Sequence, residues 1–313
     1  MINPILIRHL YGSVRRKRFF WFLSLYLLGI GLLALFVTAV AGIPLFFSGA
    51  SQTNTTFSML DLFTSGRMIY WFSGVILILT SSLLVPISAL GAFAGERENR
   101  TLDLLVTTTL KVRSIVLGKL ASALLTGAIY VLAPLPLLMT GFWLGGVTTS
   151  ELGITLLFLA LAMLSGVSSA LLISAFLKRT IAAVLIFYGL TLASAPVIMI
   201  LATATAGLAD AWRYGAFLNV QPFWIEALIQ YGWVILAGLH PLTAAIVTEA
   251  MGFEQNSWLL LHFTVERWSP DPTRTMLGTL TLPSPWITYT LFTLITTIIM
   301  LRIAIWRLKR PER

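Results

Sequence analysis

The chain has 313 residues, of which 58% are hydrophobic and only 11% are charged, and its formal net charge is +9. About a quarter of the residues in soluble domains are charged, so this composition excludes a soluble globular protein. The chain contains no cysteine, which excludes disulfides and thiolate metal sites. We therefore expect an integral membrane protein.

The first 18 residues predict a helix that lies along the membrane surface. Apolar residues recur at helical spacing, and the basic residues of positions 15–18 follow them. These apolar residues are Ile2, Ile5, Leu6, Leu10 and Val14. An apolar face beside basic residues is typical of an interfacial helix. A solvated leader with a basic anchor is the alternative interpretation.

Six uncharged runs are long enough to cross a bilayer as helices, which requires roughly 20 apolar residues each. They cover residues 20–43, 69–93, 120–144, 152–177, 181–208 and 286–301, the last extending toward Trp306. A membrane-spanning β-barrel would show short alternating segments instead. The sequence predicts an all-α polytopic membrane protein, with six transmembrane helices in a single domain over residues 1–313.

The positions of the basic residues predict the orientation. If both termini lie on one side, that side receives 17 of the 21 Lys and Arg, at positions 8–18, 97–119, 178–179 and 302–313. Cytoplasmic loops retain an excess of Lys and Arg, so we expect both termini to be cytoplasmic. Topology and the anionic headgroups of the lipid bilayer thus explain the positive charge, and nucleic acid is not an expected partner.

Residues 209–285 form the only long connection between predicted spans. Two apolar stretches within it, at 217–239 and 241–251, are too interrupted to span the bilayer. One further span would also move the basic carboxyl terminus to the opposite side. We expect short re-entrant helices before the last span, and an external cap domain is the alternative.

The interiors of the predicted spans contain no Asp, Glu, Lys, Arg or His. Ion-coupled carriers usually place an ionisable group there, so this absence disfavours a secondary carrier. Two pairs of glycines are spaced four residues apart, Gly91 with Gly95 and Gly141 with Gly145. This spacing lets helix backbones approach closely, and it predicts helix packing at these positions.

Motifs for catalysis are weak in this chain. His262 and Glu266 would share one face of a helix, but two ligands alone do not make a metal site. Gly118-Lys119 matches the end of a phosphate loop, yet Leu120 replaces Ser or Thr and Arg113 replaces the first glycine. We predict no catalytic, cofactor-binding or metal-binding residues, and no enzyme activity.

The charged segment 95–119 lies between the second and third predicted spans. It contains Glu96, Glu98, Thr101, Leu102, Leu104 and Leu105, and Gly118-Lys119 leads into the next apolar run. This pattern resembles the cytoplasmic coupling loop of ABC type-2 transporter permeases, the transmembrane subunits of ATP-binding-cassette exporters. Residues 3–8 are similar to the surface helix that opens many of these permeases. The family commonly has a Gly-Thr pair where this chain has Arg100-Thr101.

The resemblance implies a set of partners and a mechanism. Two permease subunits would pair as a homodimer or heterodimer, and each would contact a separate nucleotide-binding ATPase subunit. That subunit would hold ATP and Mg, so this chain would carry no cofactor. Export of an unidentified substrate across a bacterial cytoplasmic (inner) membrane would follow. The resemblance assigns contact with the ATPase to Glu96, Arg97, Glu98, Arg100, Thr101, Leu102, Asp103, Leu105 and Val106.

The residue types of this segment fit that role physically. On a short helix, Leu102, Leu105 and Val106 share one face, which can enter an apolar groove on a soluble partner. The surrounding charged residues can then make polar contacts with the same partner. A solvated loop obeying the charge bias is the alternative for the segment. For the whole chain, the alternatives are a non-transporting membrane assembly or anchoring factor, or a secondary carrier or channel.

Overall fold

The computed structural model describes residues 20–21, 23–32, 35–36, 59–101, 111–214, 223–255, 257–266 and 276–309. This part of the chain is mostly helical, and five of its helical segments are long and apolar enough to span a membrane. These segments are Gly66–Glu98, Val112–Leu132, Thr149–Phe176, Thr180–Thr205 and Pro285–Lys309. They overlap the second to sixth predicted runs, as expected of a multi-pass membrane protein. The third differs most from its prediction, because it covers Val112–Leu132 rather than residues 120–144.

The amino-terminal predictions fall mostly outside the described residues. The surface helix predicted for residues 1–18 lies wholly outside them. Of the first predicted span, the described residues are helical and include the short apolar helix Leu23–Leu32. Its Tyr26 ring makes an edge contact with the Tyr130 ring, at 6.1 Å between centroids. The first helix therefore packs beside the third predicted span.

The chain divides into two compact units. The first comprises Met1–Tyr188 and Thr296–Arg313, and the second comprises Gly189–Ile295. Besides Leu23–Leu32, the described helices of the first unit include α3 (Met59–Leu83), α4 (Ile87–Glu98), α6 (Val112–Leu132), α7 (Leu135–Trp143) and α8 (Thr149–Phe176). Two long helices, α9 (Thr180–Tyr214) and α12 (Pro285–Lys309), contribute residues to both units.

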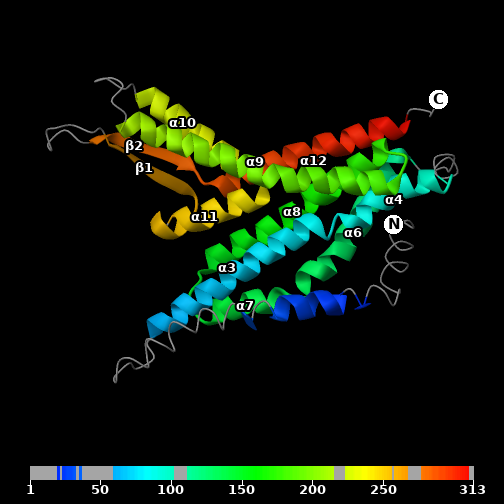
Figure 1. The fold of residues 1–313 in the computed structure, drawn as a ribbon, viewed down its shortest axis with the longest axis horizontal. Helices are drawn as coiled ribbons and strands as arrows, with labels where there is room; N and C mark the ends of the chain where they lie inside the picture. The colour runs from blue at the N-terminus through cyan, green and yellow to red at the C-terminus, as the bar shows by residue number, and fades with distance from the viewer. Residues whose placement is uncertain are drawn as a thin grey trace. The chain divides into compact units, whose positions relative to one another are not determined.

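Helix α8 is the centre of the first unit, because α3, α4 and α6 all pack against it (Figure 1). Small and apolar side chains such as Ala162, Val167 and Ala170 are fully buried along it. Helix α7 packs against α3, and a Cβ atom at Gly141 would lie 2.7 Å from both the Gly66 carbonyl oxygen and the Tyr70 Cβ. Glycine is needed there for the close approach of the two backbones.

A break separates α3 from α4 in the middle of the second predicted span. Pro86 has no N–H to donate, and the Ile87 N–H donates to the Leu84 carbonyl at 3.3 Å. The Leu83 carbonyl, which loses its helical partner Ile87, accepts a hydrogen bond of 2.7 Å from the Tyr188 hydroxyl. Glycines of two neighbouring helices, Gly127 of α6 and Gly166 of α8, face the break. A Cβ on Gly166 would lie 2.7 Å from Pro86 Cγ, so the neighbouring backbones fit closely around the proline.

The second unit contains two short helices and a β-hairpin. They are α10 (Phe223–Ala237), α11 (Pro241–Gln255), β1 (Leu260–Glu266) and β2 (Met276–Pro283). The strands pair antiparallel, with Leu261 opposite Leu282, while α10 packs on β2 and α11 on β1 (Figure 1). Val234 of α10 joins Leu261, Leu280 and Leu282 in one buried cluster, which holds the helix against the hairpin.

The hairpin departs from the all-helical prediction for residues 209–285. The two expected short helices are present as α10 and α11, but residues 260–266 and 276–283 are strands. The strand register also corrects the interpretation of His262 and Glu266. Residues four apart on a strand are about 13 Å apart along the chain, so the pair does not lie on successive turns of a helix.

His240 lies just before α11 and is buried. Its Nδ1 accepts a hydrogen bond of 3.3 Å from the Leu242 backbone N–H, which requires an unprotonated Nδ1. Burial lowers the pKa of His240 from 6.5 to about 4. The stabilisation from the neutral imidazole is therefore present above pH 6.5 and is lost as the pH falls through about 4.

Candidate functional site

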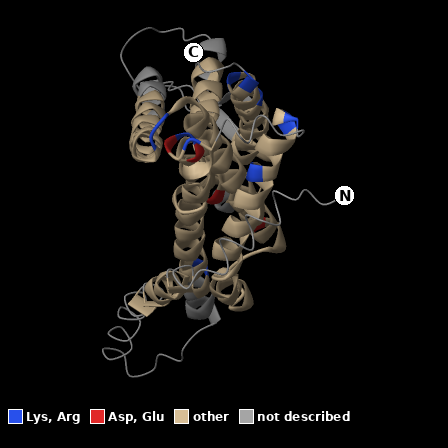
Figure 2. Ribbon diagram, turned by 90° about the vertical axis from the view of Figure 1, so that its right-hand side faces the viewer, with Lys and Arg blue, Asp and Glu red and all other residues tan. Residues whose placement is uncertain are grey.

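The candidate site lies at the end of the first unit where α4 stops and α6 begins. Figure 2 shows that most Lys and Arg of the described residues gather toward this end of the helices. The charged segment predicted as a loop over 95–119 is shorter in the structure. Residues 95–98 continue α4 and residues 112–119 belong to α6, so only residues 99–111 connect the two helices.

Lys119 of α6 forms the buried centre of the site. Its side chain is 2% exposed, and its Nζ lies 2.7 Å from Oε1 of Glu96 on α4. The ammonium group also donates to the Ala92 carbonyl and lies 4.4 Å from the centroid of the Phe93 ring. A carboxylate, a carbonyl and an aromatic face together compensate the buried positive charge. The pair fixes α4 to α6 because both partners come from different helices.

The next two residues of α4 attach it to α8 and α9. Arg97 donates a hydrogen bond of 3.0 Å to the Leu177 carbonyl, which belongs to the C-cap of α8. Glu98 Oε2 accepts hydrogen bonds from the Thr180 backbone N–H at 3.3 Å and hydroxyl at 2.9 Å. Thr180 is the first residue of α9, where a carboxylate interacts favourably with the helix dipole. Three consecutive side chains of α4 therefore reach three different helices.

Helix α4 ends sharply after these residues. The Thr101 N–H donates to the Glu96 carbonyl at 2.8 Å, and the Arg100 N–H donates to the Arg97 carbonyl at 3.0 Å. These two bonds form a Schellman motif, in which the residue after the cap adopts a left-handed conformation. Arg100 occupies that position with φ 57°, although glycine is the favoured residue there. The Arg100-Thr101 pair thus ends the helix despite lacking the glycine of the resembled family.

Hydrogen bonds to α8 also hold the residues of α4 that precede Glu96. The Ser174 hydroxyl oxygen of α8 accepts hydrogen bonds of 3.0 Å from the N–H groups of Phe93 and Ala94. A Cβ on Gly91 or Gly95 would lie 3.7 Å or 3.6 Å from the Thr180 side chain, which is an ordinary contact distance. A Cβ would therefore fit at both positions, and the start of α9 beside α4 does not depend on these two glycines.

The sequence reasoning and the structure differ on what the polar residues contact. Glu96, Arg97 and Glu98 were expected to make polar contacts around a groove on a partner, and the structure places each of them against the chain's own helices. Lys119 belongs to the Gly118-Lys119 pair of the predicted segment, but no contact was predicted for it, and Thr180 was missing from the predicted site. Their partners Glu96 and Glu98 are distant in sequence, so the pattern of residues does not indicate these contacts. The predicted contact residues Leu102, Asp103, Leu105 and Val106 lie outside the described residues.

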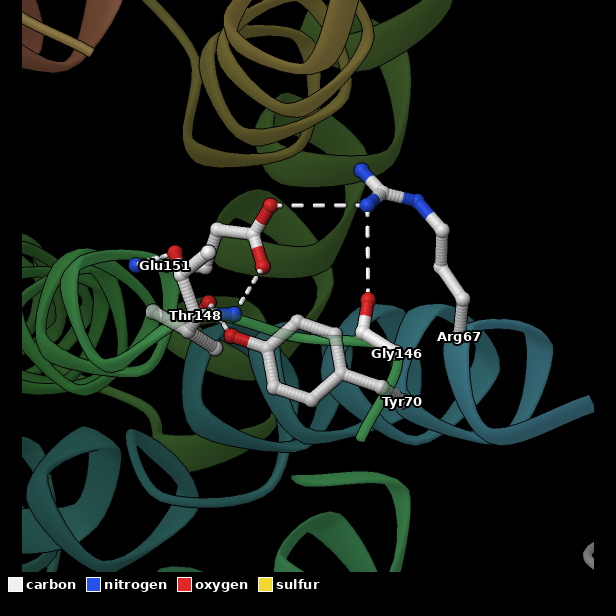
Figure 3. Close-up of polar contacts among 6 residues, drawn as sticks. Arg67, Tyr70, Gly146, Thr148 and Glu151 are labelled. Atoms are coloured by element: carbon white, nitrogen blue, oxygen red, sulfur yellow. Dashed lines mark hydrogen bonds and ion pairs between the residues drawn. The ribbon is translucent and has the colours of Figure 1, made fainter. Parts of the chain in front are cut away.

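A second polar cluster lies at the opposite end of α8, around Glu151 (Figure 3). The Glu151 side chain is 2% exposed and lies 3.5 Å from Arg67 of α3. Its Oε2 accepts a 2.7 Å hydrogen bond from the Thr148 N–H, and the Thr148 hydroxyl accepts one of 3.3 Å from the Glu151 N–H. This reciprocal pair is a capping box at the start of α8. Arg67 also donates to the Gly146 carbonyl at 3.5 Å.

The two glycines of the predicted pair, Gly141 and Gly145, have different roles in the structure. Gly141 gives the close approach to α3 described above. Gly145 instead follows the end of α7 and has φ 85°, a left-handed conformation that favours glycine. Its N–H donates to the Phe142 carbonyl at 3.0 Å. We predicted that Gly145 packs helices together, but in the structure it ends α7.

No protein-family model matches this chain, and no curated protein sequence matches it. Membership of the permease family therefore stays a prediction from residues 95–119. Within the described residues, His, Asp and Glu form no group of three or more that could hold a metal ion.

Proposed function

We propose that this chain is the membrane-spanning subunit of an ATP-binding-cassette exporter in a bacterial cytoplasmic membrane. In this proposal, a separate nucleotide-binding subunit hydrolyses ATP, and the segment after α4 receives its motion. The observation that carries the proposal is the attachment of residues 96–98 to three neighbouring helices. A partner that moves this short stretch moves α6, α8 and α9 with it.

The end of α4 is built to transmit a displacement rather than absorb it. The Schellman motif fixes the direction in which the chain leaves the helix. On the far side of α4, the break at Pro86 interrupts the helical ladder between α3 and α4. Proline breaks are points where a helix bends. The proposed motion rotates α4 about this break while α3 stays packed against α7.

ATP binding is assigned to the partner because the chain lacks a complete phosphate loop. Gly118-Lys119 is its closest approach to that motif. The structure supports the exclusion, since the Lys119 ammonium is buried and engaged by Glu96. A lysine in that position is not available to a nucleotide phosphate. ATP and Mg²⁺ therefore belong to the nucleotide-binding subunit, and two permease subunits pair to complete the pathway.

The proposal is tested by reconstitution with and without a nucleotide-binding protein encoded beside this chain. The chain alone in proteoliposomes should hydrolyse no ATP, and the partner's ATPase activity should rise when the two are combined. Leu105→Asp should abolish this rise, because a charge replaces an apolar contact. The control is Arg113→Gln, which changes an exposed residue on α6 and should leave the rise unchanged.

ATP hydrolysis by the chain alone contradicts the proposal. The absence of any rise with the partner, together with normal membrane insertion, supports a membrane anchoring factor in its place.

A further inference from the structure

The break between α3 and α4 leaves two polar atoms of one residue, Ser82, without a hydrogen-bond partner. In an unbroken helix the Ser82 carbonyl accepts from the N–H four residues later, and Pro86 has no N–H. Within the described residues, no other group donates to this carbonyl. The Ser82 hydroxyl oxygen is buried and makes no hydrogen bond either. Both atoms lie inside a candidate membrane span, where an unpaired polar group is costly.

The neighbouring carbonyl of Leu83 shows how the fold compensates such a loss. The Tyr188 hydroxyl takes the place of its helical donor at 2.7 Å. Ser82 receives no comparable replacement, although the residue is only 7% exposed. A Cβ at Gly166 of α8 would lie 3.5 Å from the Ser82 carbonyl oxygen. Because Gly166 has no side chain, this position of α8 offers the carbonyl no side-chain donor.

The Ser82 hydroxyl also differs from the other serine hydroxyls of α3, α4 and α8. Serine in a membrane helix usually donates to a carbonyl three or four residues earlier. This bond, at 2.7–3.1 Å, is made by Ser73, Ser81, Ser88, Ser165, Ser168 and Ser169. The carbonyl four residues before Ser82 belongs to Ile78, and it already accepts the Ser81 hydroxyl. A buried hydroxyl that does not bond to its own helix needs a partner from elsewhere.

We propose that an ordered water molecule binds at the break between α3 and α4. The water donates one hydrogen bond to the Ser82 carbonyl and forms a second with the Ser82 hydroxyl. The two atoms belong to one residue, so a single water can reach both, and a buried water typically has two to four polar partners. A metal cation fits less well, because it needs more free oxygen ligands and the Leu83 carbonyl is already engaged.

The bound water turns the break into a bending point. A water that inserts into the hydrogen-bond ladder is one of the causes of a helix kink. A bond made through water can change its length and direction, whereas a direct bond between backbone groups has to break. The use of this water as the pivot of the α4 motion rests on the proposed function, but the water site itself does not.

Hydroxyl-radical labelling of the purified full-length chain by X-ray radiolysis, read by mass spectrometry, tests the proposal. Radicals that form on a bound water oxidise the side chains beside it, so the buried Pro86 should be oxidised in the unaltered chain. Ser82→Ala removes a ligand of the water and should lose most of this oxidation. The matched control Ser81→Ala removes a neighbouring buried hydroxyl that is bonded to the Ile78 carbonyl, and it should keep the oxidation.

Thermal unfolding gives an independent check through its sign. Removal of an unpaired buried hydroxyl stabilises a protein, whereas removal of a hydroxyl that binds water destabilises it. Ser82→Ala should therefore unfold at a lower temperature than the unaltered chain. A higher unfolding temperature contradicts the water site.

Three labelling results overturn the proposal. They are an unoxidised Pro86 in the unaltered chain, equal oxidation of Pro86 in Ser82→Ala and Ser81→Ala, and oxidation throughout the buried residues of α8, such as Leu171, which means general entry of solvent. If Ser82→Ala does not fold, the unaltered chain decides, and oxidation of Pro86 without oxidation of Leu171 supports the site. Neither measurement uses an ATPase partner, so failure of the water site leaves the proposed function standing.

Discussion

The two ends of the first unit each bury one charged side chain, but they use it differently. At one end, Glu151 caps its own helix and meets Arg67 at 3.5 Å. At the other end, Lys119 meets Glu96 of a different helix at 2.7 Å, and the residues after Glu96 bind two more helices. The first arrangement caps α8 and joins it to α3, whereas the second joins four helices. The second is the one through which we propose that a motion passes.

The largest difference between the two ends should appear when Lys119 is removed. Lys119→Met leaves Glu96 without its buried partner, and breaking such a pair typically costs about 3–5 kcal/mol. Thermal unfolding in detergent, followed by tryptophan fluorescence, measures the loss. The control Arg113→Met removes an exposed charge from the same helix and should change stability by less than about 0.5 kcal/mol. Equal losses in the two variants contradict a structural role for the buried pair.

The next largest effect on stability is expected at the break at Pro86. Two glycine-to-alanine substitutions on α8 should change the stability in opposite directions. A Cβ at Gly166 would lie 2.7 Å from Pro86 Cγ, while one at Gly153 would meet nothing within 4 Å. Gly166→Ala should therefore destabilise the protein by about 1–3 kcal/mol through overpacking. Gly153→Ala should stabilise it by about 0.5–1 kcal/mol, because alanine favours the helix. The same fluorescence measurement applies, and a shared sign for both variants refutes the close packing at Pro86.

At the Glu151 end, we expect the cap to matter more than the ion pair. Glu151→Ala loses the hydrogen bond to the Thr148 N–H and should cost about 1–2 kcal/mol. Glu151→Gln keeps an acceptor for that N–H and loses only the charge, so it should cost less than about 1 kcal/mol. Thermal unfolding of both variants separates the two contributions. If Glu151→Gln costs as much as Lys119→Met, the contrast between the two ends disappears.

The smallest effect concerns the residues that end the two helices. Arg100 and Gly145 both adopt left-handed conformations, with φ 57° and 85°. Arg100→Gly should stabilise the protein by about 0.5–1 kcal/mol, because glycine removes the steric cost of a Cβ in this conformation. Gly145→Ala should destabilise it by about 1 kcal/mol for the same reason. Unfolding midpoints that move in the same direction in both variants contradict this explanation.

The sequence was informative where one kind of signal dominates. Bilayer thickness requires long apolar runs, so five spans were located, and α9 extends further than predicted, to Tyr214. The third span was placed least well, because it starts at Val112 rather than at residue 120 and ends at Leu132, before Pro134 and the separate helix α7. The break between α3 and α4 coincides with Pro86, a proline within an apolar run. The hairpin was not predicted, although Leu261, Phe263 and Val265 alternate with polar residues, because such a short alternation is a weaker signal than the long apolar runs around it.

The candidate site was predicted only in part. Its position between two spans followed from the charged residues, and α4 does end there. The partners of those residues could not be predicted, since the contacts Glu96–Lys119, Arg97–Leu177 and Glu98–Thr180 join distant parts of the chain. Such contacts depend on how helices are arranged around α8. A charge pattern alone does not distinguish a residue that binds a partner from one that binds a neighbouring helix.

The most direct test compares one carboxylate from each end in the presence of the nucleotide-binding subunit. ATPase stimulation by Glu96→Gln and Glu151→Gln variants is measured at equal amounts of inserted protein. We predict that Glu96→Gln lowers the stimulation by about fivefold or more, because the link from α4 to α6 is lost. Glu151→Gln should keep the stimulation of the unaltered chain. Equal stimulation by the two variants would contradict the transmission of motion through the end of α4.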